Sequence, residues 1–527
     1  MLLQIFEILS IVFTFFALTS TAYSPPWTSS GMEFFAFLAT LSIFFSIPPK
    51  KQKIFLTESI IFSLILILIS YVIFFFDKTP FKENLWLLTL YALCFIIYTN
   101  SAIIKGERYF LLVIYALLFA CLFNCFAILS QKIFITQDSI SSWIASYSST
   151  HGRPYGNFGQ PNLAATFLII GLCCGIYLQK KNKINKKTLL LLSIFLGLCL
   201  SAPSSKTAIL TLAILITTSA ILKKKIDFLV FSTAFITFLA GINFHHPTIQ
   251  TTNRDLVGSD VSTGRFDLWM TMIDALAQSP WIGYGALNTR VAHFNSRELD
   301  IVPRNQVISS SHNIFLDLLI WFGCIAGLML AVLLIKFTIS YFRYNKNNEE
   351  RLYLITPLLI HSLLEYPLFY ANFLIIFALI SSRYKKYTNT IQSKKLIYLL
   401  TFYFCLLFLF ISTDYISVSN EYKELRFHLG NFKYSQKPAP IDIRLLDITG
   451  GQFNTLLIEK IENENQLNEI KNLTMHSTTI KNYSLIINYL KEKQNRDVEI
   501  AYWMQKAKSS FNSTQIATLE KIQNSNN

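Results

Sequence analysis

The chain contains little charge for its length. Charged residues make up 15% of its 527 residues, whereas 52% are hydrophobic and 15% are aromatic. Typical soluble domains carry roughly 25% charged residues, and a membrane-spanning helix needs about 20 consecutive apolar residues. The chain offers many runs of that kind. Its composition excludes an ordinary soluble domain and predicts an all-α polytopic membrane protein.

Cysteine is absent from the polar segments, because all eight cysteines lie inside apolar runs. This excludes a disulfide framework and a CxxC metal pair, and the sequence contains neither an HExxH motif nor a Cys–His zinc pattern. A Gly-rich P-loop and a Rossmann fingerprint are missing too. We therefore expect no metal, no cofactor and no cytosolic nucleotide donor.

The apolar runs predict about 13 transmembrane helices. They lie near residues 3–22, 31–48, 54–76, 85–104, 109–130, 161–178, 188–202, 205–222, 226–243, 313–338, 352–366, 367–382 and 396–412. Alternate connections carry the Lys and Arg clusters, at 50–53, 105–108, 180–187, 223–225, 343–351 and 383–395. Basic loops are typically cytoplasmic, so the net charge of +15 needs no nucleic acid to explain it.

The remaining connections are predicted to be external, among them a large loop at 244–312. The segment 352–382 is short for two spans, but both its flanks are basic. We therefore predict a hairpin whose turn, "HSLLEYPLFY", dips into the membrane from outside. A membrane domain over 1–412 is followed by a polar tail over 413–527. Helical spacing of Val498, Ala501, Tyr502 and Met504 predicts that this tail is a small external α-helical domain.

The external loop has five Arg and no Lys, although Lys is abundant elsewhere. Arginine provides a planar fork for phosphate or carboxylate, which lysine lacks. Most of these arginines are expected to pair with acidic residues of the loop, Arg265 excepted. Arg265 is the first residue of the segment "RFDLWMTMIDALAQSPWIGYG". Apolar residues recur in this segment at helical spacing and predict a helix on the outer membrane surface. Arg265 in its first turn, beside free backbone amides, would suit an anion.

Other polar residues are predicted at the same outer boundary. In "SSSHNIFLDLL" the serines Ser309 to Ser311 are expected to cap a helix that starts near His312. Lys206, Glu365 and Arg153 are external by the same count of loops. Ionisable residues are costly at such places without a purpose, although a structural role is the alternative for each. Such a ring of cations, amides and imidazole suits a phosphate-bearing, lipid-anchored substrate.

Four motifs, in order, resemble a known family. "TGRFDLWMTMIDALAQSPWIGYG" and "SSHNIFLDLLIWFGCIAGL" resemble the signature region of the O-antigen ligase/polymerase (Wzy/WaaL) superfamily. "GRPYGNFGQPNLAATFL" and "HSLLEYPLFYANFLI" resemble hallmark segments of PglL-type protein O-oligosaccharyltransferases. The resemblance covers residues 150–385, whereas the first 130 residues are similar only in hydropathy.

This resemblance implies a metal-independent glycosyltransferase of the bacterial inner membrane with a GT-C-like ligase core. It would transfer a preassembled glycan from an undecaprenyl-diphosphate carrier to a Ser or Thr hydroxyl of a periplasmic protein such as type IV pilin. Its partners would be the lipid-linked oligosaccharide, the acceptor protein and membrane lipid, with no nucleic acid.

The resemblance maps the family's essential residues to His312, Gln160, Tyr366 and Arg265, and the other polar residues at the outer boundary are added as candidates from their position. The catalytic candidates are His312, Gln160, Tyr366 and Glu365, where either His312 or Glu365 would act as base. The diphosphate would be held by Arg265, Lys206 and Arg153, and further substrate contacts would come from Asn157, Asn162 and Asn313. Many relatives have Ser-Arg where this chain has Ser205-Lys206. The charge is kept there, but the guanidinium fork is not.

Three rival functions remain at this point. An O-antigen ligase acting on lipid A core, or a glycan polymerase, would keep the chemistry and change the acceptor. A transporter of lipid-linked glycans would carry ionisable residues along the middle of its spans, but Glu7, Asp227 and Asp317 lie near span ends. A scaffold acting through its tail would lose function when residues 413–527 are removed.

Overall fold

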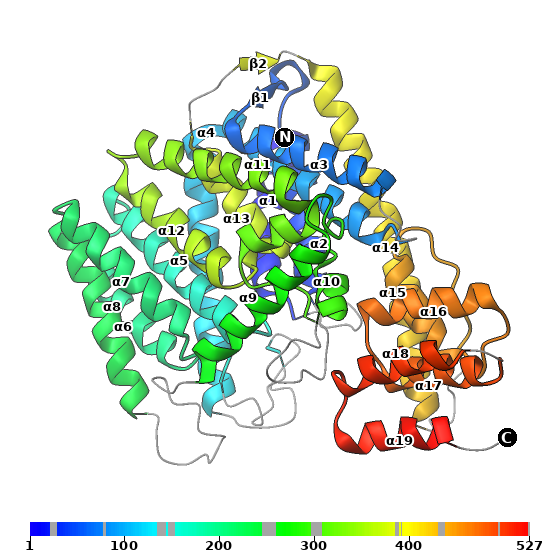
Figure 1. Cartoon of the computed structure of the whole chain (residues 1–527). Helices are drawn as coiled ribbons and strands as arrows, with labels where there is room; N and C mark the ends of the chain where they lie inside the picture. Colours follow the sequence, from blue (N-terminus) through cyan, green and yellow to red (C-terminus); the bar gives the residue numbers. More distant parts are fainter. Residues whose placement is uncertain are drawn as a thin grey trace. The chain divides into compact units, whose positions relative to one another are not determined.

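The architecture is helical throughout the part of the chain that can be described. The computed structural model describes residues 1–21, 29–76, 81–133, 144–145, 153–244, 260–296, 308–384, 389–391, 393–430, 438–493 and 496–524. Within these ranges the only strands are a short antiparallel pair, β1 (Ile54–Leu56) and β2 (Asn389–Ile391), with Phe55 opposite Thr390 (Figure 1).

The chain divides into two compact units. The first comprises residues 1–64, 91–258 and 333–404, and the second comprises 65–90, 259–332 and 405–527. Helices that cover the predicted spans are α1 (Leu2–Thr19), α2 (Ser30–Phe45), α3 (Glu58–Phe76), α4 (Glu83–Ile133), α5 (Pro161–Lys180), α6 (Lys186–Ser201), α7 (Lys206–Ile221), α8 (Lys225–Phe244), α11 (Ile314–Tyr344), α12 (Glu349–Leu364), α13 (Ala371–Ser381) and α14 (Lys394–Leu429).

Each predicted span coincides with a helix, and α4 covers two spans because Gly106 (φ 74°) interrupts it. Seven described helices are long and apolar enough to cross a bilayer, namely α1, α3, α4, α5, α8, α11 and α14. This confirms the all-helical class and is consistent with a multi-pass membrane protein, while the count of 13 stays a prediction. The expected hairpin is present as α12 and α13, joined through the short 3₁₀ turn η4 (Pro367–Phe369).

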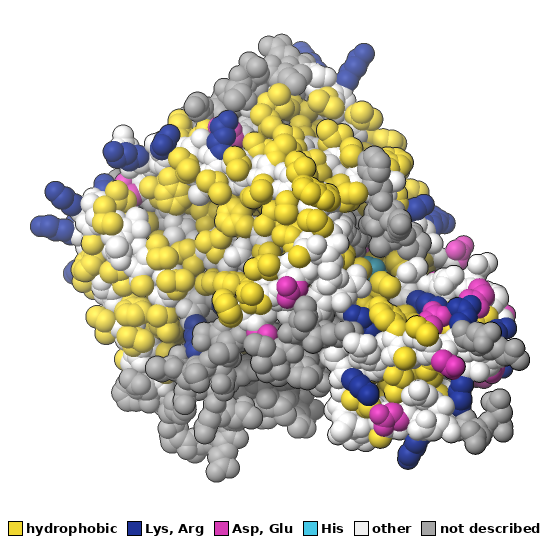
Figure 2. All heavy atoms as spheres, in the orientation of Figure 1, with side chains coloured by type: hydrophobic (Ala, Val, Ile, Leu, Met, Phe, Trp, Pro, Cys, Tyr) yellow, Lys and Arg dark blue, Asp and Glu magenta, His cyan; other side chains and the backbone are white. Residues whose placement is uncertain are grey.

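Helix α5 is the central element of the first unit. It is buried on all sides from Leu163 to Leu178, and Gly171 and Gly175 let Cys121 and Leu192 approach its backbone. A helix that is apolar all round belongs in an interior. By contrast, only 28% of the apolar windows of α1, α3 and α14 is buried. Hydrophobic side chains accordingly cover much of the visible surface (Figure 2), as a lipid-facing surface requires.

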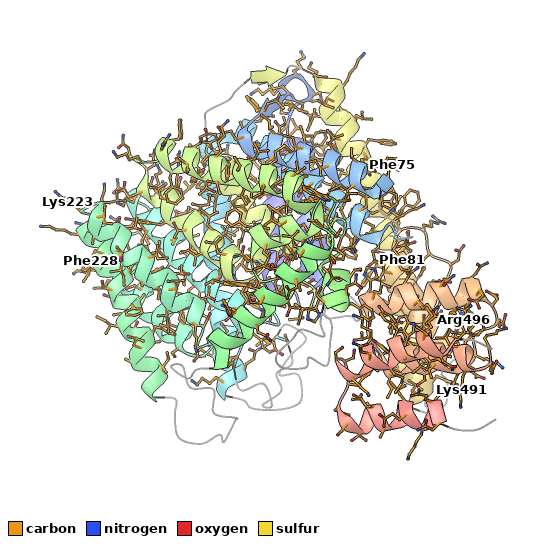
Figure 3. The ribbon with its side chains drawn as sticks, viewed as in Figure 1. Phe75, Phe81, Lys223, Phe228, Lys491 and Arg496 are labelled. Carbon is orange, nitrogen blue, oxygen red and sulfur yellow. The ribbon has the colours of Figure 1, made fainter. Side chains whose placement is uncertain are left out.

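Ion pairs gather at one end of the first unit. Lys180 at the end of α5 pairs with Asp227 of α8 at 3.0 Å and with Glu349 of α12, and Lys224 pairs with the same glutamate at 2.8 Å. Lys223 and Phe228 project from the α7–α8 corner (Figure 3). The ends of α5 and α7 and the starts of α8 and α12 thus meet where the basic loops were predicted to share one side.

The second unit contains residues 259–332 and the tail from residue 405, together with residues 65–90. Its further helices are α9 (Asp260–Gln278), α10 (Thr289–Ser296), α15 (Asp447–Leu457), α16 (Glu464–His476), α17 (Ile480–Lys491), α18 (Asp497–Lys508) and α19 (Ser513–Asn524). Helices α4 and α15 cap each other. Asp447 accepts from the backbone N–H groups of Lys82 and Glu83 at 2.8 and 3.0 Å, and Glu83 accepts from the N–H of Thr449 at 2.7 Å. Carboxylates satisfy the free amides and positive dipole of both N-termini.

The described part of the tail is helical, as predicted. Ile500, Trp503, Met504 and Ala507 of α18 lie in the core, whereas Val498 is 87% exposed. Trp503 packs against Phe294 of α10, with ring centroids 6.1 Å apart. The predicted domain boundary at 413 falls inside α14, which continues to Leu429.

A buried histidine makes the tail sensitive to acid. His476 is 4% exposed and its ring lies 5.7 Å from that of Phe81. Burial, with a smaller contribution from the positive charge of Arg290, lowers the pKa of His476 from 6.5 to about 3. Below pH 6.5, His476 therefore binds a proton in the unfolded chain but stays neutral in the folded tail. The contribution of neutral His476 to the free energy of unfolding is fully present above pH 6.5 and is lost as the pH falls toward 3.

We expect His476→Gln to reduce this loss of stability between pH 7 and pH 4. The measurement is thermal unfolding and limited proteolysis of the purified full chain at both pH values. His428→Gln, which changes an exposed histidine of α14, is the control and should behave like the unaltered chain. An equal pH dependence in all three proteins would contradict the prediction.

Candidate active site

Asn162 joins three distant segments of the first unit. It lies in the first turn of α5, and its Nδ2 donates to Glu365 Oε1 at 2.9 Å. Its Oδ1 accepts from Ser205 Oγ at 2.9 Å and from an Nη atom of Arg153 at 3.4 Å. We name these residues, Arg153, Asn162, Ser205 and Glu365, the α5–α12 cluster. The structure therefore brings together residues that the sequence placed only on one side of the membrane.

Arg153 is largely engaged by backbone carbonyls. Its Nε donates to Pro203 O at 2.7 Å and an Nη donates to Ser204 O at 3.2 Å. The planar guanidinium thereby closes the turn that precedes α7, where Ser204 adopts φ 46°. A role for Arg153 in holding diphosphate stays a prediction. In this structure it orients the turn that presents Lys206, which is exposed and begins α7.

The loop before α5 is held by buried amides of α4 that the sequence reading missed. Gln131 Oε1 accepts from the N–H groups of Tyr155 and Gly156 at 3.1 and 2.8 Å, and its Nε2 donates to Gly156 O at 2.7 Å. Asn124 Oδ1 accepts from the N–H of Asn157 at 3.2 Å. These side chains replace the backbone partners that an adjacent strand would supply.

Asn157 and Gln160 occupy different environments within this loop. Asn157 is buried, donates to Thr19 O at 2.6 Å and accepts from the N–H of Ala145 at 3.0 Å. Its amide is therefore engaged within the protein, and substrate binding by Asn157 stays a prediction. Gln160 is half-buried, extended (φ −139°) and forms the N-cap of α5 without a side-chain capping bond. The loop thus presents Gln160 at a helix N-terminus.

A second contact between α5 and α12 lies one turn below the first. Thr166 Oγ1 and His361 Nδ1 are 2.8 Å apart, and both residues are buried. Thr166 follows Asn162 by four residues and His361 precedes Glu365 by four, so the two contacts form parallel rungs. The sequence reading omitted His361 and Thr166, although the four-residue spacing beside Asn162 and Glu365 is a signal it could have used.

Tyr366 belongs to the turn between α12 and α13. Its ring centroid lies 5.8 Å from Phe369 and 6.0 Å from Tyr370, whose ring it stacks against. The preceding Glu365 is only 5% exposed. Aromatic packing of Tyr366 therefore holds one side of the turn, and Asn162 holds the carboxylate of Glu365 on the other side.

In the second unit, His312 lies two residues before helix α11, which was expected to start near it. Helix α11 starts at Ile314, and Asn313 Oδ1 accepts from the N–H groups of Phe315 and Leu316 at 3.0 and 3.3 Å. Asn313 is therefore the cap, and the predicted serine cap is wrong. His312 is half-buried in the left-handed region, with φ 60°. We call residues 309–313 the His312 turn.

Arg265 and the His312 turn are connected through Trp269. Its indole Nε1 donates to Ser311 O at 2.9 Å, and Arg265 precedes it by one helical turn on the same face. Because α9 begins at Asp260, Arg265 lies in the second turn, and the predicted first-turn position is wrong. The expected surface stripe is present: Phe266, Met270 and Ile273 are 63%, 45% and 48% exposed.

The segment after α9 packs closely against a break in α11 at Gly323. Gly323 (φ 70°) interrupts α11, and the carbonyls of Ile320 and Trp321 accept from the N–H groups of Tyr284 and Gly285 at 2.8 and 2.9 Å. A Cβ on Gly323 would lie 2.3 Å from the carbonyl oxygen of Trp281. Backbone groups released by the break are thus satisfied, as a membrane interior requires.

No group of three or more His, Cys, Asp or Glu positioned to hold a metal ion occurs among the described residues. Metal independence of the reaction stays a prediction.

Comparisons with known proteins bear on the same segments. Residues 188–331 match the family described as O-Antigen ligase, 351–455 match "Virulence factor membrane-bound polymerase, C-terminal", and 154–178 match "Protein glycosylation ligase". The first of these contains Arg265 and His312, and the last contains Gln160 and Asn162. Residues 188–331 of the chain are thus similar to the O-antigen ligase family.

Two curated relatives from Acinetobacter baylyi have names that state a more specific activity than the family descriptions do. The "ComP-specific O-oligosaccharyltransferase" is 31% identical over 261 residues, which are 47% of this chain and 46% of the relative. The "General O-oligosaccharyltransferase" is 29% identical over 240 residues, 42% of each chain. The match covers less than half of either relative's length. It confirms the resemblance to protein O-oligosaccharyltransferases that the motifs indicated.

We expect Gly323→Ala to destabilise the protein more than Gly106→Ala. Both residues have positive φ with ψ near 180°, a region essentially restricted to glycine, but nothing lies within 4 Å of a Cβ on Gly106. The comparison isolates the collision with Trp281 from the strain of the backbone. Thermal unfolding of the purified variants measures the difference, and equal shifts would show that no close approach exists at Gly323.

Proposed function

We propose that the chain transfers a preassembled glycan from an undecaprenyl-diphosphate carrier to a Ser or Thr hydroxyl of a periplasmic protein such as a pilin. The observation that carries this proposal is the bond from Trp269 to Ser311, which fixes the helix bearing Arg265 against the His312 turn. A cation and an imidazole on two elements that are joined in this way suit a reaction in which a phosphate group leaves. Both lie in the part that matches O-antigen ligases.

In this reaction the acceptor oxygen attacks the anomeric carbon of the glycan. The bond between that carbon and the diphosphate oxygen breaks, the carrier diphosphate leaves, and the acceptor proton passes to a base. Negative charge grows on the diphosphate as the bond breaks, so Arg265 and Lys206 would lower the barrier. An imidazole nitrogen can accept a proton from an attacking hydroxyl, and we assign this step to His312.

We assign Glu365 to positioning rather than to proton transfer. Its Oε1 already accepts from Asn162, and the carboxylate is buried. Gln160 and Tyr366, on the loop before α5 and the turn after α12, would contact the glycan or the acceptor. By the positive-inside rule, the end of the first unit that carries the ion pairs faces the cytoplasm of a bacterial inner membrane. The α5–α12 cluster then faces the periplasm.

A second candidate keeps the chemistry and changes the acceptor. Residues 351–455 match the C-terminal part of a membrane-bound polymerase, which favours another glycan as acceptor, and the match of residues 188–331 to O-antigen ligases favours lipid A core. The purified chain with lipid-linked glycan, a pilin, and lipid A core in separate reactions distinguishes the two. An intact-mass increase of the pilin supports the proposal, and an increase on the glycan or lipid alone supports the second candidate.

We expect His312→Ala and Arg265→Ala each to lower glycan transfer about 100- to 1000-fold, the usual cost of removing one charge-stabilising group. The controls are His428→Ala and Arg426→Ala, which change exposed residues of α14 and should leave transfer unchanged. All four proteins should accumulate in the membrane. Normal transfer by both site variants would refute the proposed function.

Glu365→Gln separates positioning from proton transfer. Glutamine keeps the Oε1 atom that accepts from Asn162, so we expect activity within about tenfold of the unaltered chain, the effect of a single hydrogen bond. Glu365→Ala removes that acceptor and should lower activity further. A loss of more than 100-fold in Glu365→Gln would instead make Glu365 the base.

A further inference from the structure

We propose that Asp317 is a positioning residue that holds His312 in its left-handed turn through Ser310 and Ser311. This inference rests on the proposed function in one respect, the acid–base role of His312. Asp317 is one of three acidic residues that the sequence reading treated only as charges near span ends. It is 1% exposed, and a buried carboxylate needs partners for both oxygens.

The conformation of His312 requires support from its surroundings. A residue with a side chain rarely adopts φ 60°, because Cβ approaches the following carbonyl. Such conformations persist where neighbouring groups over-determine them, and they concentrate at functional sites. The His312 N–H donates to Ser310 Oγ at 3.0 Å. The orientation of that hydroxyl therefore governs whether this bond can form.

Asp317 fixes the orientation of the Ser310 hydroxyl. Ser310 Oγ donates its only hydrogen to Asp317 Oδ2 at 2.8 Å, which leaves a lone pair for the N–H of His312. The other carboxylate oxygen, Oδ1, accepts from the N–H of Ser311 at 2.8 Å. One carboxylate thus determines the positions of both residues before His312.

A second chain of bonds fixes the carboxylate itself. Trp321 Nε1 donates to Thr289 Oγ1 at 2.7 Å, and that hydroxyl donates to Asp317 Oδ1 at 3.1 Å. Thr289 is fully buried and Trp321 is 2% exposed. Because each hydroxyl has one hydrogen, the direction of every bond from Trp321 to His312 is determined. Removing the Thr289 hydroxyl therefore disturbs His312 without touching it.

The alternative is a network that only stabilises the fold. Thr289→Val and Thr289→Ser distinguish the two readings, because valine keeps the shape and serine keeps the hydroxyl. Thr474→Val is the control for stability, since Thr474 is a buried threonine of α16 whose hydroxyl bonds only within its own helix. Asp317→Asn and Ser310→Ala test the same path at two further points if Thr289→Val fails to accumulate.

Two readouts are needed for each purified variant. The first is kcat and KM for glycan transfer to the acceptor. The second is the rate at which diethyl pyrocarbonate modifies His312, measured by mass spectrometry relative to the exposed His428. The labelling rate reports the setting of the imidazole without requiring catalysis.

We expect Thr289→Val to lower kcat about tenfold, as loss of one buried hydrogen bond implies, with KM changed less than about twofold and the His312 labelling rate altered. Thr289→Ser and Thr474→Val should match the unaltered chain in both readouts. Unchanged kcat and labelling in Thr289→Val, Asp317→Asn and Ser310→Ala would overturn the inference. If His312→Ala is inactive in the same experiment, the proposed function still holds. Altered labelling with an active His312→Ala would uphold the positioning and refute the function.

Discussion

The candidate site depends on one constraint: irregular backbone near a membrane must find hydrogen-bond partners inside the protein. In this chain buried side chains supply them. Gln131 binds the backbone at Tyr155 and Gly156, Arg153 binds the carbonyls of the turn before α7, and Asp317 binds the His312 turn. Each support is a side chain on, or beside, a regular helix. The segments that carry the candidate residues are therefore held in place by hydrogen bonds to regular helices or to residues next to them.

Glycines extend the same principle to the helices. Where Gly323 breaks α11, the released carbonyls bind the segment that contains Gly283, and the two backbones approach too closely for any Cβ. The break occurs nine residues after the start of α11 at Ile314. It separates a short first segment, which carries Asp317 and Trp321, from the longer apolar remainder. The network behind His312 is thereby attached to the segment after α9 as well as to α10.

Hydrophobic length and loop charge were enough to predict most of the fold. The helices, the α12–α13 hairpin and the helical tail follow from the spacing and length of apolar runs. The residues of the site were found partly by motif, but their partners were not. Asp317, Gln131 and His361 look like ordinary polar residues of long helices, and their importance arises from contacts with segments 6 to 195 residues away. The start of α9 and the residue that caps α11 were misjudged because caps depend on backbone geometry that a one-dimensional pattern does not contain.

The different uses of arginine and lysine link the structure to the proposed chemistry. Arg153 binds two carbonyls through two nitrogens of one rigid plane, Nε and an Nη, a fixed geometry that a lysine ammonium does not provide. Lys206, in contrast, is exposed at the start of α7, where a cation opposes the helix dipole and costs about 0.3–1 kcal/mol. An anion bound at that N-terminus reverses the sign of this effect, because it interacts favourably with both the amides and the ammonium group. The turn that Arg153 stabilises therefore presents a charge whose electrostatic cost is offset only when a group such as a diphosphate is bound.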